Sequence, residues 1–105
     1  MGMNLNIFDL PSLPLNDELT TILQESNKIR IERIISTGQT SGWYDQDEAE
    51  FIVLVEGFAK LEFENDRFLS MKKGDTFLIH PHQLHRVAHT SMHPPCIWLC
   101  VFYKV

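Results

Sequence analysis

Two stretches of the chain hold side chains whose types and spacing suit chemistry. The first is Tyr44-Asp45-Gln46, followed by Glu50. The second holds four histidines, His80, His82, His85 and His89. Imidazole and carboxylate groups transfer protons near neutral pH and also bind divalent first-row metals. The two stretches therefore predict a polar site, provided that the fold brings them together.

Short β-strands must position these side chains. Alternating or continuous apolar runs predict strands over residues 29–36, 50–56, 59–64, 67–71, 76–79, 86–89 and 97–103. Asn65-Asp66 and Lys73-Gly74-Asp75 read as turns between them. Many short strands with closely spaced turns indicate a β-sandwich or a β-barrel.

The period of a strand sets which of the candidate side chains share a face. Side chains two residues apart point the same way. Tyr44 and Gln46 should therefore share a direction, with Asp45 opposite. By the same rule His85 and His89 should lie on one face.

The first part of the chain predicts a different structure. An extended arm leads to Asn16, which can cap a short helix. The apolar stripe of that helix would consist of Leu19, Ile22 and Leu23.

Composition bounds the function classes. The chain has 105 residues, of which 44% are hydrophobic and 22% charged, as expected for one globular domain. Its formal charge is −5, and no basic cluster exceeds Lys72-Lys73, which argues against nucleic-acid binding. No apolar run approaches the ~20 residues of a membrane span, and no secretory signal is evident, so we expect a cytoplasmic protein.

The residues from Gly38 to Gly57 resemble the first motif of the cupin family. That motif runs Gly, five residues, His-x-His, three or four residues, Glu, six residues, Gly. Here the spacing from Gly38 through Glu50 to Gly57 fits throughout, and Tyr44 and Gln46 replace the two histidines.

The residues from Gly74 to His89 resemble the second cupin motif, which runs Gly, five residues, Pro-x-Gly, two residues, His, three residues, Asn. His85 falls on the motif histidine, and His80 and His82 stand where Pro and Gly usually stand. The resemblance implies an all-β jelly-roll barrel, the double-stranded β-helix, over residues 29–105. Residues 1–28 would form the arm and short helix packed on it.

The resemblance also implies a divalent metal site in the barrel. The four family ligand positions hold Tyr44, Gln46, Glu50 and His85. An amide binds such metals weakly and a neutral phenol scarcely at all. His82 could complete a two-histidine, one-carboxylate set with His85 and Glu50, or Asp45 could replace Gln46 after a register shift. Iron, zinc, nickel and manganese all remain open.

Alternatives without a metal use the same residues. His85 could act as general base and Tyr44 as general acid, with Glu50 tuning His85. Glu50 and His85 could also form only a satisfied polar pair. The function is therefore either a metal-dependent oxygenase, isomerase or lyase acting on a small polar substrate, or a non-catalytic, metal-free module that binds a small molecule. A structural dimer is a third alternative.

Two further features lie outside the motifs. If the odd positions of residues 29–35 face inward, Arg33 enters the barrel and needs an anion; otherwise it reaches solvent at a strand end. Several strands are apolar on both faces, and a second subunit is the expected cover for one of them. We therefore expect a homodimer.

Overall fold

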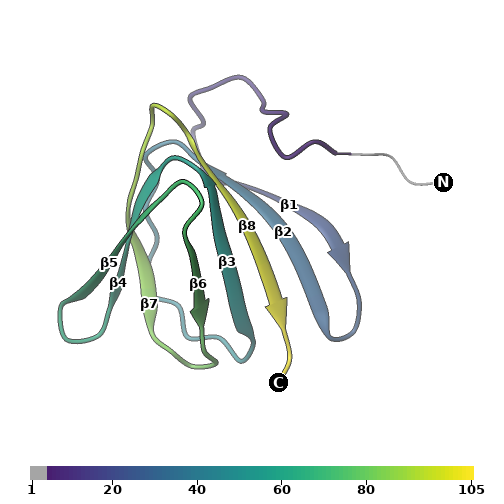
Figure 1. Ribbon diagram of the computed structural model, residues 1–105, viewed down its shortest axis with the longest axis vertical. Coiled ribbons are helices and arrows are strands. Elements are labelled where there is room, and N and C mark those ends of the chain that lie inside the picture. The colour runs from purple at the N-terminus through teal and green to yellow at the C-terminus, as the bar shows by residue number, and fades with distance from the viewer. Residues whose placement is uncertain (1–4) are drawn as a thin grey trace.

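The computed structural model describes residues 5–105 and shows two antiparallel sheets (Figure 1). Its strands are β1 (Leu19–Glu25), β2 (Ile29–Ser36), β3 (Ala49–Glu56), β4 (Phe58–Phe63), β5 (Arg67–Lys72), β6 (Thr76–Ile79), β7 (His85–Thr90) and β8 (Cys96–Tyr103). The all-β prediction is confirmed, and the seven predicted strands match β2 to β8 to within one residue at each end.

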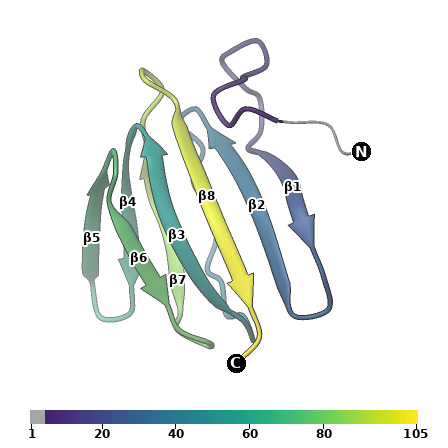
Figure 2. The same ribbon diagram turned by 45° about the vertical axis from the view of Figure 1, so that its right-hand side comes forward.

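The two sheets differ in size. The larger has the order β1-β2-β8-β3-β6 and the smaller the order β5-β4-β7. Figure 2 shows the smaller sheet standing beside and behind the larger one. Residues 5–105 contain no helix with the length and hydropathy of a membrane span.

The predicted N-terminal helix is wrong. Residues 19–25 form strand β1, which pairs antiparallel with β2 from Leu19 opposite Ile35 to Glu25 opposite Arg30. Three consecutive β-branched residues, Thr20 to Ile22, favour an extended backbone. The open edge of β2 also offers unpaired backbone groups that a helix would leave unsatisfied. Residues 1–4 of the expected arm lie outside the described residues.

Gly57 forms the corner at which the chain leaves the larger sheet for the smaller one. It separates β3 from β4 and has a φ of 98°. A Cβ atom there would lie 2.8 Å from the Pro95 carbonyl oxygen and 2.9 Å from Cys96 Cα. Only glycine fits this backbone and this approach, so the corner closes β4 against the start of β8.

The even-numbered side chains of β2 face the space between the sheets, and the odd-numbered ones face away from it. Arg30, Glu32 and Ile34 line the interior cavity described below. The odd positions face outward, so the inward placement of Arg33 is wrong. Arg33 does not reach solvent either: it is buried under the arm, and its Nη1 lies 2.7 Å from the Asp9 carbonyl oxygen.

The arm is therefore held by a buried guanidinium. We expect Arg33→Leu to lower the free energy of unfolding by about 1–3 kcal/mol, the contribution of a hydrogen bond to a charged group. It should also speed chymotrypsin cleavage at Phe8. Denaturant melts and limited proteolysis measure both effects. Arg67→Leu, at an exposed arginine, is the matched control, and equal behaviour of the two variants would contradict the assignment.

A bulge in β7 separates two histidines that strand alternation places together. Leu61 of β4 pairs with Val87, but Lys60 pairs with His89, so β7 carries one extra residue. Past this irregularity His89 is exposed, whereas His85 is buried. The prediction that the two share a face is wrong for this reason.

Candidate functional site

A cavity of about 360 Å³ lies between the two sheets. Its wall draws on both, and it includes Tyr44, Gln46, Glu50 and His85. Glu50 comes from β3 in the larger sheet and His85 from β7 in the smaller one. The rest of the wall is formed by Glu18, Thr20, Arg30, Glu32, Ile34, Ile52, Leu61, Ile79, Val87, Trp98, Cys100 and Phe102.

Glu50 is a buried carboxyl group with little compensation. It is 8% exposed, and Gln46 Nε2 donates a hydrogen bond to its Oε1 at 3.1 Å. Burial raises the pKa of Glu50, although the bond from Gln46 and the nearby His85 act in the opposite direction. The site therefore favours the protonated carboxylic acid more than water does.

His85 has a defined tautomer. It is 4% exposed, and its Nδ1 lies 2.8 Å from the Gln83 carbonyl oxygen. A carbonyl only accepts hydrogen bonds, so Nδ1 carries the proton and Nε2 keeps its lone pair in the neutral ring. Nε2 lies 3.8 Å from Glu50 Oε1, beyond hydrogen-bond range. Gln83, which sequence reasoning missed, therefore orients His85, and Glu50 does not.

Tyr44 stands opposite His85 at the edge of the cavity. The two residues form an isolated antiparallel bridge, with Tyr44 N donating to the His85 carbonyl oxygen at 2.8 Å. Their ring centroids are 5.5 Å apart, and Tyr44 is 45% exposed. Burial, followed by Glu18 and Glu50, raises the pKa of the Tyr44 phenol, so it stays protonated and can donate a hydrogen bond or a proton.

His82 does not reach the cavity. Its side chain is exposed on the surface, where Nδ1 lies 2.7 Å from Asp45 Oδ1 and Nε2 lies 3.4 Å from Asp47 Oδ1. The hydrogen bond to Asp45 raises the pKa of His82. The expected swing of His82 into a metal site, and the replacement of Gln46 by Asp45, both fail because these two side chains pair with each other outside the barrel.

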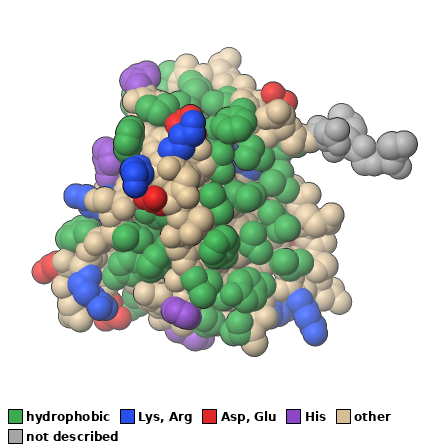
Figure 3. Space-filling view, viewed as in Figure 1, with side chains coloured by type: hydrophobic (Ala, Val, Ile, Leu, Met, Phe, Trp, Pro, Cys, Tyr) green, Lys and Arg blue, Asp and Glu red, His purple; other side chains and the backbone are tan. Residues whose placement is uncertain are grey.

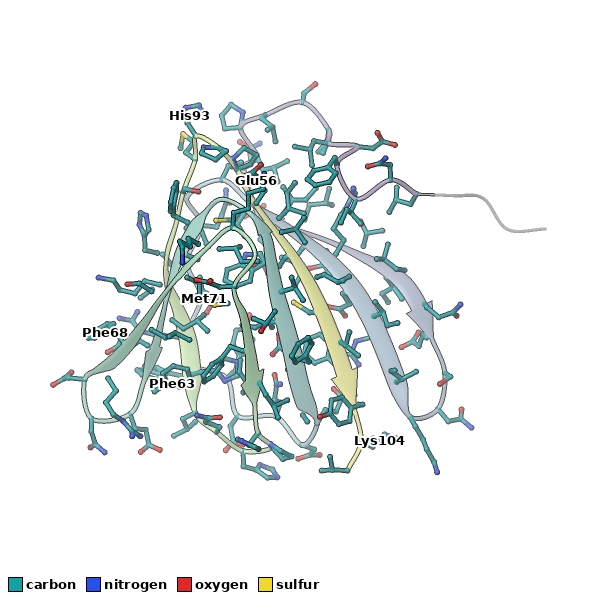
Figure 4. The ribbon with its side chains drawn as sticks, viewed as in Figure 1. Glu56, Phe63, Phe68, Met71, His93 and Lys104 are labelled. Atoms are coloured by element: carbon teal, nitrogen blue, oxygen red, sulfur yellow. The ribbon has the colours of Figure 1, made fainter. Side chains whose placement is uncertain are left out.

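His82 still contacts the site through its backbone. Its N–H donates to the Gln46 carbonyl oxygen at 2.7 Å, and its φ is 61°. The loop before β7 is thereby tied to the segment that carries Gln46 and Tyr44. The other two histidines, His80 and His93, are exposed, and Figure 4 shows His93 at the far end of β7, in the loop that leads to β8.

Sequence reasoning also missed the charged residues of β2 that line the cavity. Arg30 Nε donates to Glu32 Oε2 at 2.7 Å, and its other nitrogens lie 3.2 and 3.3 Å from the carboxylate of Glu48. The alternation of residues 29–35 places Arg30 and Glu32 on one face of the strand, but it does not tell which face is inward.

The donor set fits a tightly bound transition metal poorly. Within residues 5–105 no three His, Cys, Asp or Glu side chains converge as a metal-holding group. Of the four family ligand positions only Glu50 and His85 carry strong donors, and Gln46 and Tyr44 add an amide and a protonated phenol. We therefore derive no chemical step through a metal.

The raised pKa of Glu50 makes stability depend on pH. A carboxyl group whose pKa is raised on folding contributes stability below its unfolded pKa, and this is lost as pH rises through the folded pKa. We expect Glu50→Gln to raise the unfolding temperature at pH 8 more than at pH 5. The gain should be about 0.5–2 kcal/mol at pH 8, as for other substitutions that relieve strain in a functional site.

Thermal melts across this pH range measure the effect. Glu64→Gln, at an exposed glutamate, is the control and should show no such difference between the two pH values. A Glu50→Gln variant that loses more stability at pH 8 than at pH 5 would contradict the assignment.

Comparison with known proteins gives a consistent result. The family model described as "Cupin domain" matches residues 32–102. A Ralstonia eutropha protein, provisionally described as a mannose-6-phosphate isomerase, has a structure similar to this chain at a TM-score of 0.92 and 35% identity, with 99% of this chain and 100% of that chain covered. The search of curated proteins gives no match.

More distant structures share the fold. A cupin superfamily protein from Desulfitobacterium hafniense matches at a TM-score of 0.77 and 14% identity, over 90% of this chain and 84% of that one. A Klebsiella pneumoniae protein with a double-stranded β-helix domain matches at a TM-score of 0.79 and 16% identity, over 99% of this chain and 91% of that one. The two sheets, the motif spacing and these similarities confirm the predicted fold, and the chain belongs to the cupin family.

Proposed function

We propose that the protein binds a small polar molecule in the barrel cavity and catalyses proton transfer between two of its adjacent carbon atoms, as an isomerase of the aldose–ketose type. The observation that carries the proposal is the approach of His85 Nε2 to Glu50 Oε1, 3.8 Å apart in the cavity between the two sheets. The Gln83 carbonyl oxygen holds the opposite ring nitrogen of His85, and burial raises the pKa of Glu50. The name of the Ralstonia protein supports the same reaction class.

The pair suits a proton transfer next to a carbonyl group. His85 Nε2 would take the proton from the carbon beside the carbonyl, and the electrons of that C–H bond would form the C=C bond of an enediol. The carbonyl oxygen would take the proton of Glu50. His85 would then return a proton to the former carbonyl carbon. The hydroxyl group on the carbon that lost its proton would give its own proton to Glu50, which completes the isomerisation.

Tyr44 would assist from the cavity edge. Its phenol stays protonated, so it can donate a hydrogen bond to an oxygen of the ligand, and its role as general acid remains a prediction. Gln83 would keep His85 in the reactive tautomer through the 2.8 Å hydrogen bond.

Deuterium exchange tests the proposed chemistry. We expect the protein to incorporate solvent deuterium at C2 of mannose or of mannose 6-phosphate, as followed by proton NMR. His85→Gln should lower the rate by about 10²–10⁴-fold, the usual contribution of a general base. His89→Gln is the matched control, because His89 lies on the same strand but is exposed outside the cavity.

Two results would contradict the reaction. One is an exchange rate that His85→Gln leaves unchanged. The other is ligand binding, measured by calorimetry, without exchange in the wild-type protein. That second result would favour the non-catalytic binding module instead, whose specific support is the loss of both histidines of the first motif.

We also infer that the protein forms a homodimer through the outer face of the larger sheet. Ile31, Val101, Phe51 and Leu78 lie in register across four strands, and none is charged. Hydrophobic side chains gather over this face in Figure 3. Phe51 is 38% exposed at its centre. A flat apolar surface of this kind favours a second copy as its cover.

A charge on this face should separate the subunits. We expect the wild-type protein to sediment as a dimer and Phe51→Glu to sediment as a monomer, because a buried unpaired charge opposes association. Phe68→Glu is the matched control, because Phe68 is 53% exposed on the outer side of β5, where Figure 4 shows it. Analytical ultracentrifugation measures the oligomeric state of each variant. A dimer that survives Phe51→Glu would refute this interface.

A further inference from the structure

The charge balance of the cavity restricts what can bind in it. Three carboxyl groups belong to its wall, those of Glu18, Glu32 and Glu50. The basic groups of the same wall are the guanidinium of Arg30 and the imidazole of His85. A guanidinium group is charged at every physiological pH, so Arg30 is the one permanent cation among these lining residues.

The guanidinium group of Arg30 already contacts three side chains of the protein. Its Nε donates to Glu32, and its two terminal nitrogens lie within 3.3 Å of the Glu48 carboxylate. Its guanidinium carbon also stands 4.4 Å from the centroid of the Phe102 ring. Burial lowers the pKa of Arg30, but the two carboxylates raise it further, so the net shift is upward. Two anions neutralise this cation, and an incoming anion would have to displace one of them.

A phosphate ester finds no other partner here. Phosphate carries a charge of about −1.5 to −2 at neutral pH and is bound by Arg or Lys side chains or by helix N-termini. Lysine is missing from the lining residues, and residues 5–105 form no helix. A phosphate group in this cavity would therefore meet carboxylates without a free cation.

We propose that the ligand of this cavity is an uncharged polyhydroxy compound of about monosaccharide size, without a phosphate group. This inference rests on the proposed binding site, and it departs from the phosphorylated substrate in the name of the Ralstonia protein. Carboxylates and the Gln46 amide accept hydrogen bonds from hydroxyl groups. The apolar wall, which includes Trp98 and Phe102, matches the C–H face of a sugar ring.

The size of the cavity agrees with this class. About 360 Å³ is at the lower end of the range of roughly 300–1,000 Å³ found for small-molecule pockets. A single sugar unit fits such a volume, and a longer chain of sugars would have to extend out of the cavity.

Two ligands that differ only in the phosphate group test the inference. Titration calorimetry with mannose and with mannose 6-phosphate compares the two, and glucose and fructose complete the uncharged panel. We expect at least one uncharged sugar to bind the wild-type protein, and mannose 6-phosphate to bind at least about tenfold more weakly than that sugar. Equal or tighter binding of the phosphate ester would overturn the inference, and so would the absence of binding by the whole uncharged panel.

A second variant tests the cause. Glu32→Gln combined with Glu48→Gln should release Arg30 and improve binding of mannose 6-phosphate by about tenfold or more. Glu62→Gln, which frees Arg86 outside the cavity, should not do so. Thermal melts and circular dichroism establish that the double variant is folded. A folded double variant with no gain in affinity for the phosphate ester would overturn the charge argument.

The two proposals fail separately. The calorimetric preference does not depend on proton transfer. Deuterium exchange that is insensitive to His85→Gln would therefore remove the proposed reaction while leaving the preference for an uncharged ligand intact. Conversely, a measured preference for the phosphate ester would leave the His85 exchange experiment unaffected.

Discussion

Glu50 and His85 belong to different sheets, and closure of the two sheets on one another holds them together. Each is almost fully buried, yet their nearest nitrogen and oxygen atoms are 3.8 Å apart and do not form a hydrogen bond. A buried carboxyl group that is only partly compensated by its neighbours opposes folding in its charged form. The packing of the remaining core, including the corner at Gly57, must therefore offset the cost of this site.

The same closure places two charged residues of β2 inside. Arg30 and Glu32 line the cavity, which can hold hydrogen-bonding groups. On the outer face, the arm covers Arg33 at one end, and the apolar side chains of Ile31, Val101 and Phe51 lie over β2, β8 and β3. The alternation of β2 between the two faces thus underlies both the charged cavity wall and the burial of Arg33 under the arm.

Surface contacts also shape the site from outside. The pair formed by His82 and Asp45, with the bond from His82 N to the Gln46 carbonyl, joins the two loops at the mouth. Gln46 in turn donates to Glu50. A residue expected as a metal ligand therefore acts on the site through backbone and loop geometry. This is consistent with a cupin in which Tyr44 and Gln46 replace the two histidines of the first motif.

Local sequence determined most of the strands and the positions of Glu50 and His85, because alternation and turn residues act over a few neighbours. Only the tertiary structure decided the rest. An open sheet edge turned residues 19–25 into a strand, a bulge in β7 turned His89 outward, and the arm covered Arg33. Arg30 and Glu32 line the cavity between the two sheets. Each of these outcomes depends on which element packs against a face, and a strand's own alternation does not contain that information.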